Sequence, residues 1–253
     1  MDGTDLVLHA AVLLAALLQA ATGIGFGVIA GPIILLVLST GAAVQITILL
    51  SLLIAVVLTP TLFRRTDRTL LIRFLLGTLA GLPLGILVFL LVSIDTLKLL
   101  AAFAVLFMAI SASGLLTLSA DRGDSGRRRF EDLGVGVISG IMSTSLAMPG
   151  PVAAARMSAL AHAKDTIRAT VLVMFVFSYT AAIGFQAALV GVSGETLKLT
   201  ATLVPATLIG VGLGKLCVDW ISERLFRRLL VGLLVATSLS LLVGSLGPLL
   251  DLL

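Results

Sequence analysis

An apolar run longer than a bilayer is thick constrains this chain most. Residues 6–38 contain no Asp, Glu, Lys or Arg, and a straight helix of that length would measure about 50 Å, against about 30 Å of hydrocarbon. Inside the run, Ala21-Thr-Gly-Ile-Gly-Phe-Gly-Val-Ile-Ala-Gly-Pro32 is rich in glycine, so we expect a membrane helix to stop and restart there. Such a break is tolerated only where its backbone is buried in protein or lines a cavity, which makes it a candidate binding site.

The composition is that of an integral membrane protein. Of 253 residues, 59% are hydrophobic and 12% are charged, against about 25% charged in soluble domains. The excess of Lys and Arg over Asp and Glu, 17 to 13, gathers in short loops, which indicates orientation in a membrane rather than binding of nucleic acid. The two histidines, His9 and His162, have no neighbours at metal-ligand spacing. We therefore expect no enzyme activity, no metal and no cofactor.

The two halves of the chain repeat each other. Gly31-Pro32 matches Gly150-Pro151, and Gly81-Leu-Pro-Leu-Gly85 matches Gly210-Val-Gly-Leu-Gly214. Apolar segments long enough to span a bilayer follow each broken stretch. We predict an all-α integral membrane protein of two repeats, residues 1–120 and 133–253, joined by a polar linker at 121–132. Each repeat is a broken or re-entrant helical hairpin followed by three transmembrane helices.

Loop charge predicts that the repeats are inverted. If each broken segment enters and leaves the membrane on one side, 15 of the 17 Lys and Arg residues fall on one side, and only Lys98 and Lys198 on the other. If each broken segment crosses once, the split is 9 to 8. Because Lys and Arg concentrate in cytoplasmic loops, we expect hairpins, both termini outside and a cytoplasmic linker. Internal repeats of this kind are usual in secondary transporters.

The two broken stretches supply most of the candidate substrate-binding residues. The first offers Thr22, Gly23, Gly25, Phe26 and Gly27, and the second offers Ser143, Thr144, Ser145 and Gly150. If helices restart at Gly27 and Gly150, their free N–H groups and the hydroxyls would converge on an anion near the midplane. The alternative is that the hydroxyls bond their own helix backbone and the glycines serve close packing.

Three further polar residues in or near the spans are candidates. Arg156 follows Pro151 by five residues within an apolar stretch, and it either gives the site positive charge or reaches the cytoplasmic surface. Arg168 opens the next span and either contacts substrate or lies at the interface. Gln45 either binds substrate or links helices.

Several short motifs resemble the sulfite exporter TauE/SafE family, the toluenesulfonate uptake permeases. They are Gly23-Ile-Gly-Phe-Gly-Val-Ile-Ala-Gly-Pro32, Ala42-Ala-Val-Gln-Ile-Thr47, Gly136 with Gly140, Pro149-Gly-Pro151 and Arg168-Ala-Thr170. The resemblance extends over about residues 6–250 and implies a membrane permease for sulfite and small organosulfur anions, including sulfonates. The sequence departs from the family at Ser143–Ser145, where glycines are frequent, and at Arg156, where an aromatic is common.

Together these features predict a secondary transporter of a small anion, a sulfur oxyanion or a sulfonate. Its site lies between the two broken stretches, and access alternates from one side of the membrane to the other. A passive anion channel and a non-transporting membrane subunit are the alternatives. The expected partners are the anion and the lipid bilayer, with a homo-oligomer left open, and the expected location is the bacterial plasma (inner) membrane.

Overall fold

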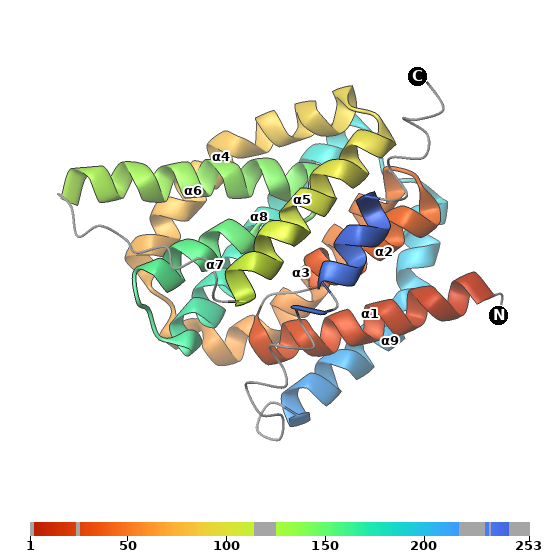
Figure 1. Ribbon diagram of the computed structural model, residues 1–253, viewed down its shortest axis with the longest axis horizontal. Helices are drawn as coiled ribbons and strands as arrows, with labels where there is room; N and C mark the ends of the chain where they lie inside the picture. Colours follow the sequence, from red (N-terminus) through yellow and green to blue (C-terminus); the bar gives the residue numbers. More distant parts are fainter. Residues whose placement is uncertain (1–2, 24–25, 114–124, 218–230, 233, 243–253) are drawn as a thin grey trace.

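The computed structural model describes residues 3–23, 26–113, 125–217, 231–232 and 234–242 of the chain (Figure 1). Helices make up most of these residues, and none of them is in a strand. The helices are α1 (Gly3–Thr22), α2 (Phe26–Leu38), α3 (Ala42–Leu62), η1 (Phe63–Arg65), α4 (Arg68–Leu91), α5 (Ile94–Ser113), α6 (Ser125–Leu146), α7 (Gly150–Ala159), α8 (Lys164–Leu189) and α9 (Gly194–Cys217). Residues 231–232 and 234–242 are also helical.

Six of the described helices are long and apolar enough to cross a membrane: α1, α3, α4, α5, α8 and α9. The 13 residues of α2 and the 10 residues of α7 give helices of about 20 Å and 15 Å, which reach only part of the way. Large apolar side chains such as Leu76, Leu79 and Leu91 are exposed on α4, as expected of a surface that lipid covers. The prediction of an all-α integral membrane protein is confirmed, whereas the inversion of the repeats stays a prediction.

Both predicted breaks in the broken stretches are present, and their positions agree closely with the sequence. The first helix ends at Thr22 and the next starts at Phe26, one residue before the expected Gly27. In the second half, α6 ends at Leu146 and α7 starts at Gly150, as expected. Residues 125–132 of the predicted linker form the first turns of α6, and residues 121–124 lie outside the described residues.

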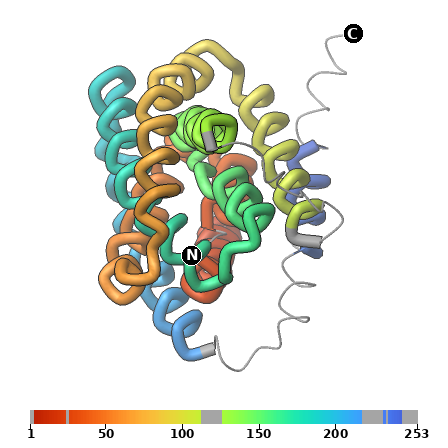
Figure 2. Tube along the Cα trace, turned by 90° about the vertical axis from the view of Figure 1, so that its left-hand side faces the viewer, coloured from red at the N-terminus to blue at the C-terminus, as the bar shows by residue number. Residues whose placement is uncertain are grey.

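Glycines pack α4 against α6 without intervening side chains. A Cβ atom added to Gly77, Gly81 or Gly85 of α4 would meet backbone atoms of α6, and one added to Gly136 or Gly140 of α6 would meet α4. The two helices lie side by side along one edge of the molecule (Figure 1), and Figure 2 shows α6 end-on between α4 and α5. Small residues allow this close approach, which in lipid drives helix association by packing.

Close packing at glycines also joins α1 to α9. A Cβ atom on Gly210 or Gly214 of α9 would meet the carbonyl oxygen of Leu13 or Leu17 of α1. The pair lies at the opposite edge from α4 and α6 in the view of Figure 1. Each close pair therefore combines the first helix of one predicted repeat with a later helix of the other.

Helices α3 and α8 are the most buried of the spans, and they pack on each other at the centre. They also contact the two glycine-packed pairs, α8 touching α4 and α3 touching α9. At the periphery, the hydroxyl of Ser238 in the last helical segment donates to the Ala102 carbonyl of α5 at 3.1 Å. The centre of the molecule is thus where side chains of α3 and α8 meet the two breaks.

Candidate functional site

The first break is a glycine-capped helix end. Gly23 has φ +82°, and its N–H donates to the Gln19 carbonyl of α1 at 2.7 Å. A left-handed residue that returns a hydrogen bond to the last turn is a common helix terminator, and glycine adopts it without a steric penalty. A Cβ atom on Gly23 would also collide with the Arg168 side chain, at 2.5 Å from its Cγ. Gly23 thus ends α1 and lets α8 approach.

The second break is formed by two prolines and by Ala147, whose backbone is in the left-handed region. Ala147 has φ +59°, which costs a non-glycine residue energy and persists only where the surroundings fix it. The Met148 N–H donates back to the Met142 carbonyl at 3.0 Å, and Pro149 precedes the first residue of α7. Because Pro149 and Pro151 lack N–H groups, the chain cannot continue the hydrogen bonding of α6 and starts a new helix.

The two breaks meet at Gly27 and Ala147. Gly27, in the first turn of α2, leaves no room for a Cβ atom because the Ala147 carbonyl oxygen occupies that position. The Tyr179 hydroxyl donates to the same carbonyl at 2.9 Å, and the nearby helix α3 contributes Ser51, whose buried hydroxyl has no hydrogen-bond partner among the described residues. All four residues are buried. The two broken stretches therefore contact each other in the structure, with α3 and α8 packed nearby, while their convergence on an anion stays a prediction.

The other first-break residues have local partners. The Thr22 hydroxyl donates to the Leu18 carbonyl of its own helix at 2.7 Å. Phe26 is fully buried, and its N–H donates to Gln19 Oε1 at 3.1 Å. The Gln19 amide nitrogen, Nε2, is also buried and has no hydrogen-bond partner among the described residues. Gly25 lies outside the described residues. Beside the contact of Gly27 with Ala147, the described part of the first break thus contains a buried amide donor without a partner.

The three predicted hydroxyls of the second half are buried and bonded to carbonyls. Thr144 Oγ1 donates to the Gly140 and Leu82 carbonyls, each at 3.1 Å, and Ser145 Oγ donates to Ile141 at 2.7 Å. Ser143 Oγ is 3.4 Å from the Ser178 carbonyl. Thr144 and Ser145 thus bond carbonyls of their own helix, as the alternative expects, whereas Ser143 bonds a carbonyl of α8 and Thr144 also bonds one of α4. Gly150, equally buried, begins α7.

The guanidinium of Arg168 reaches the last turn of α1. Its Nη2 donates to the Ala20 carbonyl, and its Cγ covers Gly23. Cations are favoured at a helix C-terminus, because carbonyl groups and the helix dipole make that end partially negative. The structure thus brings Arg168 to the first break, where it contacts α1 from α8.

Gln45 lies away from this convergence. Its Nε2 donates to the Gly191 carbonyl at 2.9 Å, and it lines a cavity of about 620 Å³ with residues of α4, α5 and the α8–α9 turn. Tyr179 lies ten residues before the end of α8, or about 15 Å along the helix. The cavity is therefore distinct from the convergence of the breaks, and Gln45 is one of its polar lining groups.

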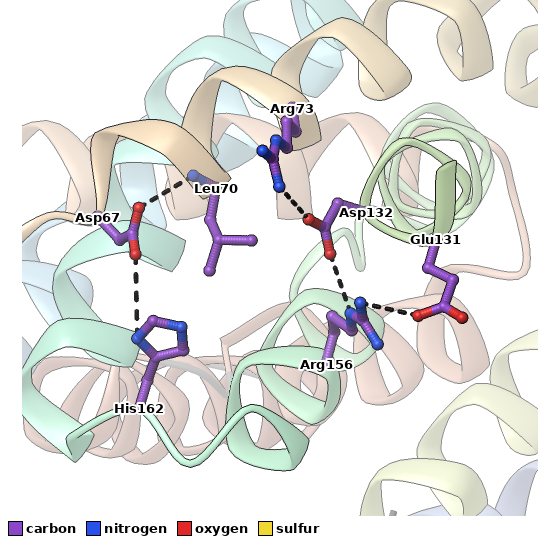
Figure 3. A network of polar contacts seen from close by, with 7 residues as sticks. All are labelled: Asp67, Leu70, Arg73, Glu131, Asp132, Arg156 and His162. Carbon is purple, nitrogen blue, oxygen red and sulfur yellow. Dashed lines mark hydrogen bonds and ion pairs between the residues drawn. The ribbon is translucent and has the colours of Figure 1, made fainter. Parts of the chain in front are cut away.

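Arg156 lies in a network of ion pairs that the sequence did not predict. Its Nε is 3.0 Å from Asp132 Oδ1 and its Nη2 is 2.9 Å from Glu131 Oε2, while Arg73 Nη1 of α4 is 2.9 Å from Asp132 Oδ2. Figure 3 shows Asp132 between the two arginines. Arg156 is six residues after Gly150, about 9 Å along α7. Its positive charge is thus balanced by two carboxylates of α6.

Gln186 is a second buried amide near the second break. Its Nε2 donates to the Thr144 carbonyl at 2.7 Å, and within the described residues its Oε1 has no partner. It lies two turns beyond Tyr179 on α8. A polar residue inside an apolar span is the only sequence signal for Gln19, Tyr179 and Gln186, and that signal cannot distinguish a binding group from a link between helices.

A comparison with known protein families gives one match over most of the chain. The family model described as Sulfite exporter TauE/SafE matches residues 8–241. No curated protein and no solved structure matches the chain.

Proposed function

Because the chain belongs to the sulfite exporter TauE/SafE family, we propose that it is a secondary transporter of a small sulfur-containing anion, sulfite or an organic sulfonate. The matched region includes both breaks, most of the first described span and all of the other five, so nearly the whole membrane unit takes part in the resemblance. The six spans and the two partial helices suit a protein that moves a solute through the bilayer.

The observation that carries the proposal is the contact between the breaks at Gly27 and Ala147. A helix N-terminus offers N–H groups that have no acceptor within the helix, together with a partial positive charge. Both α2 and α7 begin with buried residues beside this contact region, Phe26 and Gly150. We place the anion between residues 22–27 and 143–150, held by N–H groups in the first turns of α2 and α7 other than that of Phe26, which donates to Gln19 Oε1. The Ser143, Thr144 and Ser145 hydroxyls also hold it after they rotate away from their carbonyl partners.

The arginines contribute charge from the cytoplasmic side. Arg168 places a cation at the first break, next to the proposed site. The cluster that contains Arg156 holds three arginines, Arg73, Arg127 and Arg156, against Glu131 and Asp132, an excess of one positive charge. Such an excess attracts anions toward the inner opening. Gln45 contacts the anion in the outer cavity, before it reaches the breaks.

Alternating access follows from two inverted repeats in this proposal. The glycine contacts make α4 with α6, and α1 with α9, close pairs that move as units. Rocking of these pairs about α3 and α8 opens the site to one side at a time. The protein lies in the bacterial plasma (inner) membrane with both termini outside and the linker inside, as a monomer or a homo-oligomer.

Flux of radiolabelled sulfite into proteoliposomes tests the proposal. A transporter gives saturable uptake and counterflow, in which unlabelled sulfite or methanesulfonate inside the vesicle accelerates entry of the label. Uptake that rises linearly with concentration, with no counterflow, would show a passive channel instead. Absence of flux above that of protein-free vesicles for sulfite and for a panel of sulfonates would refute transport and favour a non-transporting subunit.

A further inference from the structure

A broken membrane helix presents two helix ends of opposite sign at the same place. The C-terminal end of the first piece offers carbonyl oxygens and is partially negative, and the N-terminal end of the second piece offers N–H groups and is partially positive. In transporters, unwound carbonyls bind cations and helix N-termini bind anions. A site for an anion alone therefore requires that the carbonyls be occupied.

At the first break, two of the last four carbonyls of α1 are occupied, those of Gln19 and Ala20. Arg168 of α8 donates to the Ala20 carbonyl, and the Gly23 N–H donates to the Gln19 carbonyl. One further carbonyl of this last turn, that of Leu18, accepts from the Thr22 hydroxyl. What the break retains is donor capacity, including the fully buried Nε2 of Gln19, which has no partner in the part of the chain that the structure describes.

At the second break, α8 again supplies the donors. The Tyr179 hydroxyl donates to the Ala147 carbonyl at 2.9 Å, and Gln186 Nε2 donates to the Thr144 carbonyl at 2.7 Å. Ala147 is the residue that touches Gly27, so its carbonyl oxygen would be the nearest negative group to an anion at the start of α2.

The three donors form one stripe on one helix. Tyr179 follows Arg168 by 11 residues and Gln186 follows it by 18, about three and five complete turns, so all three project from the same face of α8. One face of a single span thus caps carbonyls at the ends of both α1 and α6.

We propose that this stripe of α8 makes the binding site selective for anions over cations. Arg168, Tyr179 and Gln186 occupy the Ala20, Ala147 and Thr144 carbonyls at the ends of α1 and α6, so that fewer carbonyls are left for a cation and the breaks favour an oxyanion at their N–H groups. The inference rests on the proposed function and adds to it three residues that determine selectivity for anions. They are positioning residues for the site, because they act on the substrate through the carbonyls that they occupy.

Replacement of Tyr179 by Phe tests the proposal with the least change in shape. Without the hydroxyl, the Ala147 carbonyl faces the site uncapped, and we expect the KM for sulfite uptake to rise about fivefold to tenfold while the maximal rate stays within about twofold. The rise should be larger for sulfite, which carries two charges when unprotonated, than for methanesulfonate, which carries one. A substitution that only loosened the fold would not discriminate between the two anions.

A matched control lies on the adjacent residue. The Thr180 hydroxyl is exposed and donates to the Val176 carbonyl of its own helix, so Thr180→Val removes a hydroxyl from α8 without touching a break, and its KM should equal that of the unmodified protein. Two substitutions of Arg168 provide a second test. Arg168→Lys keeps a charged donor and should preserve most of the affinity, whereas Arg168→Met should raise the KM.

The possible outcomes are distinct. Unchanged KM values in Tyr179→Phe, or an equal rise for both anions accompanied by a lower melting temperature, would overturn the role of the stripe while leaving transport intact. If Tyr179→Phe does not fold, the Arg168→Lys and Arg168→Met pair decides, and equal KM values for the two would overturn the proposal. If the unmodified protein shows no flux, the proposed function itself fails.

Discussion

Arg156 Nε lies 3.0 Å from Asp132 Oδ1, and this pair ties the helix after the second break, α7, to the first turns of α6. Only 12% of the Arg156 side chain and 2% of the Asp132 side chain are exposed. An ion pair so poorly solvated is costly to break on one side, because the remaining charge stays buried without a partner.

Asp132→Asn should therefore destabilise the protein by about 2–4 kcal/mol, since Arg156 keeps only Glu131 and Arg73 loses its carboxylate. Thermal unfolding in detergent, followed by light scattering or by the fluorescence of a thiol-reactive dye, measures the change in stability. The control is Arg127→Gln, which removes a pair with 70% of the arginine side chain exposed and should cost no more than about 1 kcal/mol. Equal losses in the two variants would contradict this account.

Asp132 and Arg156 should also be energetically coupled. In a double-mutant cycle with Asp132→Asn and Arg156→Gln, the double variant should be more stable than the sum of the single losses predicts, by at least about 1 kcal/mol. The reason is that each single change leaves one buried charge, whereas the double change leaves neither. Additive losses would indicate that the two side chains act independently.

Three glycines of α9 should respond differently to alanine. A Cβ atom at Gly210 or Gly214 would meet backbone carbonyls of α1, which cannot yield, so each substitution should sharply lower the yield of folded protein. Gly212 has nothing within 4 Å of its Cβ position, and its replacement should be neutral or stabilising by up to about 1 kcal/mol. Size-exclusion profiles of the three variants in detergent provide the comparison.

The contact between the breaks can be tested on α2 alone. Gly27→Ala places a methyl group against the Ala147 carbonyl and should abolish anion uptake in proteoliposomes. Gly31→Ala, one turn later, meets the Thr47 methyl group at 3.3 Å, a side chain that can shift slightly, and should retain most of the uptake. If Gly27→Ala transports as well as Gly31→Ala, the site does not lie at this contact.

The proposed orientation predicts which surfaces a membrane-impermeant thiol reagent reaches. After Cys217→Ser, a cysteine at Arg129 in the first turns of α6 should be labelled only when the reagent is inside the vesicle or the cell is opened. A cysteine at Glu195, at the start of α9, should be labelled in intact cells. The opposite pattern would show that the termini are cytoplasmic.

The positions of the breaks were predictable because their cause is local. Gly23, Pro149 and Pro151 end or start a helix through their own backbone chemistry, whereas Pro32 lies inside α2, so the residue type indicates the stretch but not the exact position of the break. The packing of Gly81 and Gly140 was predictable for a similar reason, since small residues four apart mark a close helix contact in lipid.

The partners of the polar side chains were not predictable. Asp132 was assigned to a cytoplasmic linker from its charged neighbours, yet it lies in α6 and is buried by Arg73 and Arg156, which come from 59 residues before and 24 residues after it. Tyr179 and Ala147 are 32 residues apart and meet only in the folded protein. Hydrophobic periodicity predicts which face of a helix is buried, but not which helix packs against that face. The neighbouring helix decides whether a hydroxyl or an amide is free to bind a ligand.

The glycine faces of α4 and α1 also set an order of events during synthesis. When α4 enters the bilayer, the surface that accepts α6 has no protein to cover it until about 50 more residues have been made. The matching surface of α1 waits far longer, until α9 emerges near the end of the chain. The first half therefore cannot complete its final packing until α6 and α9 of the second half have entered the bilayer.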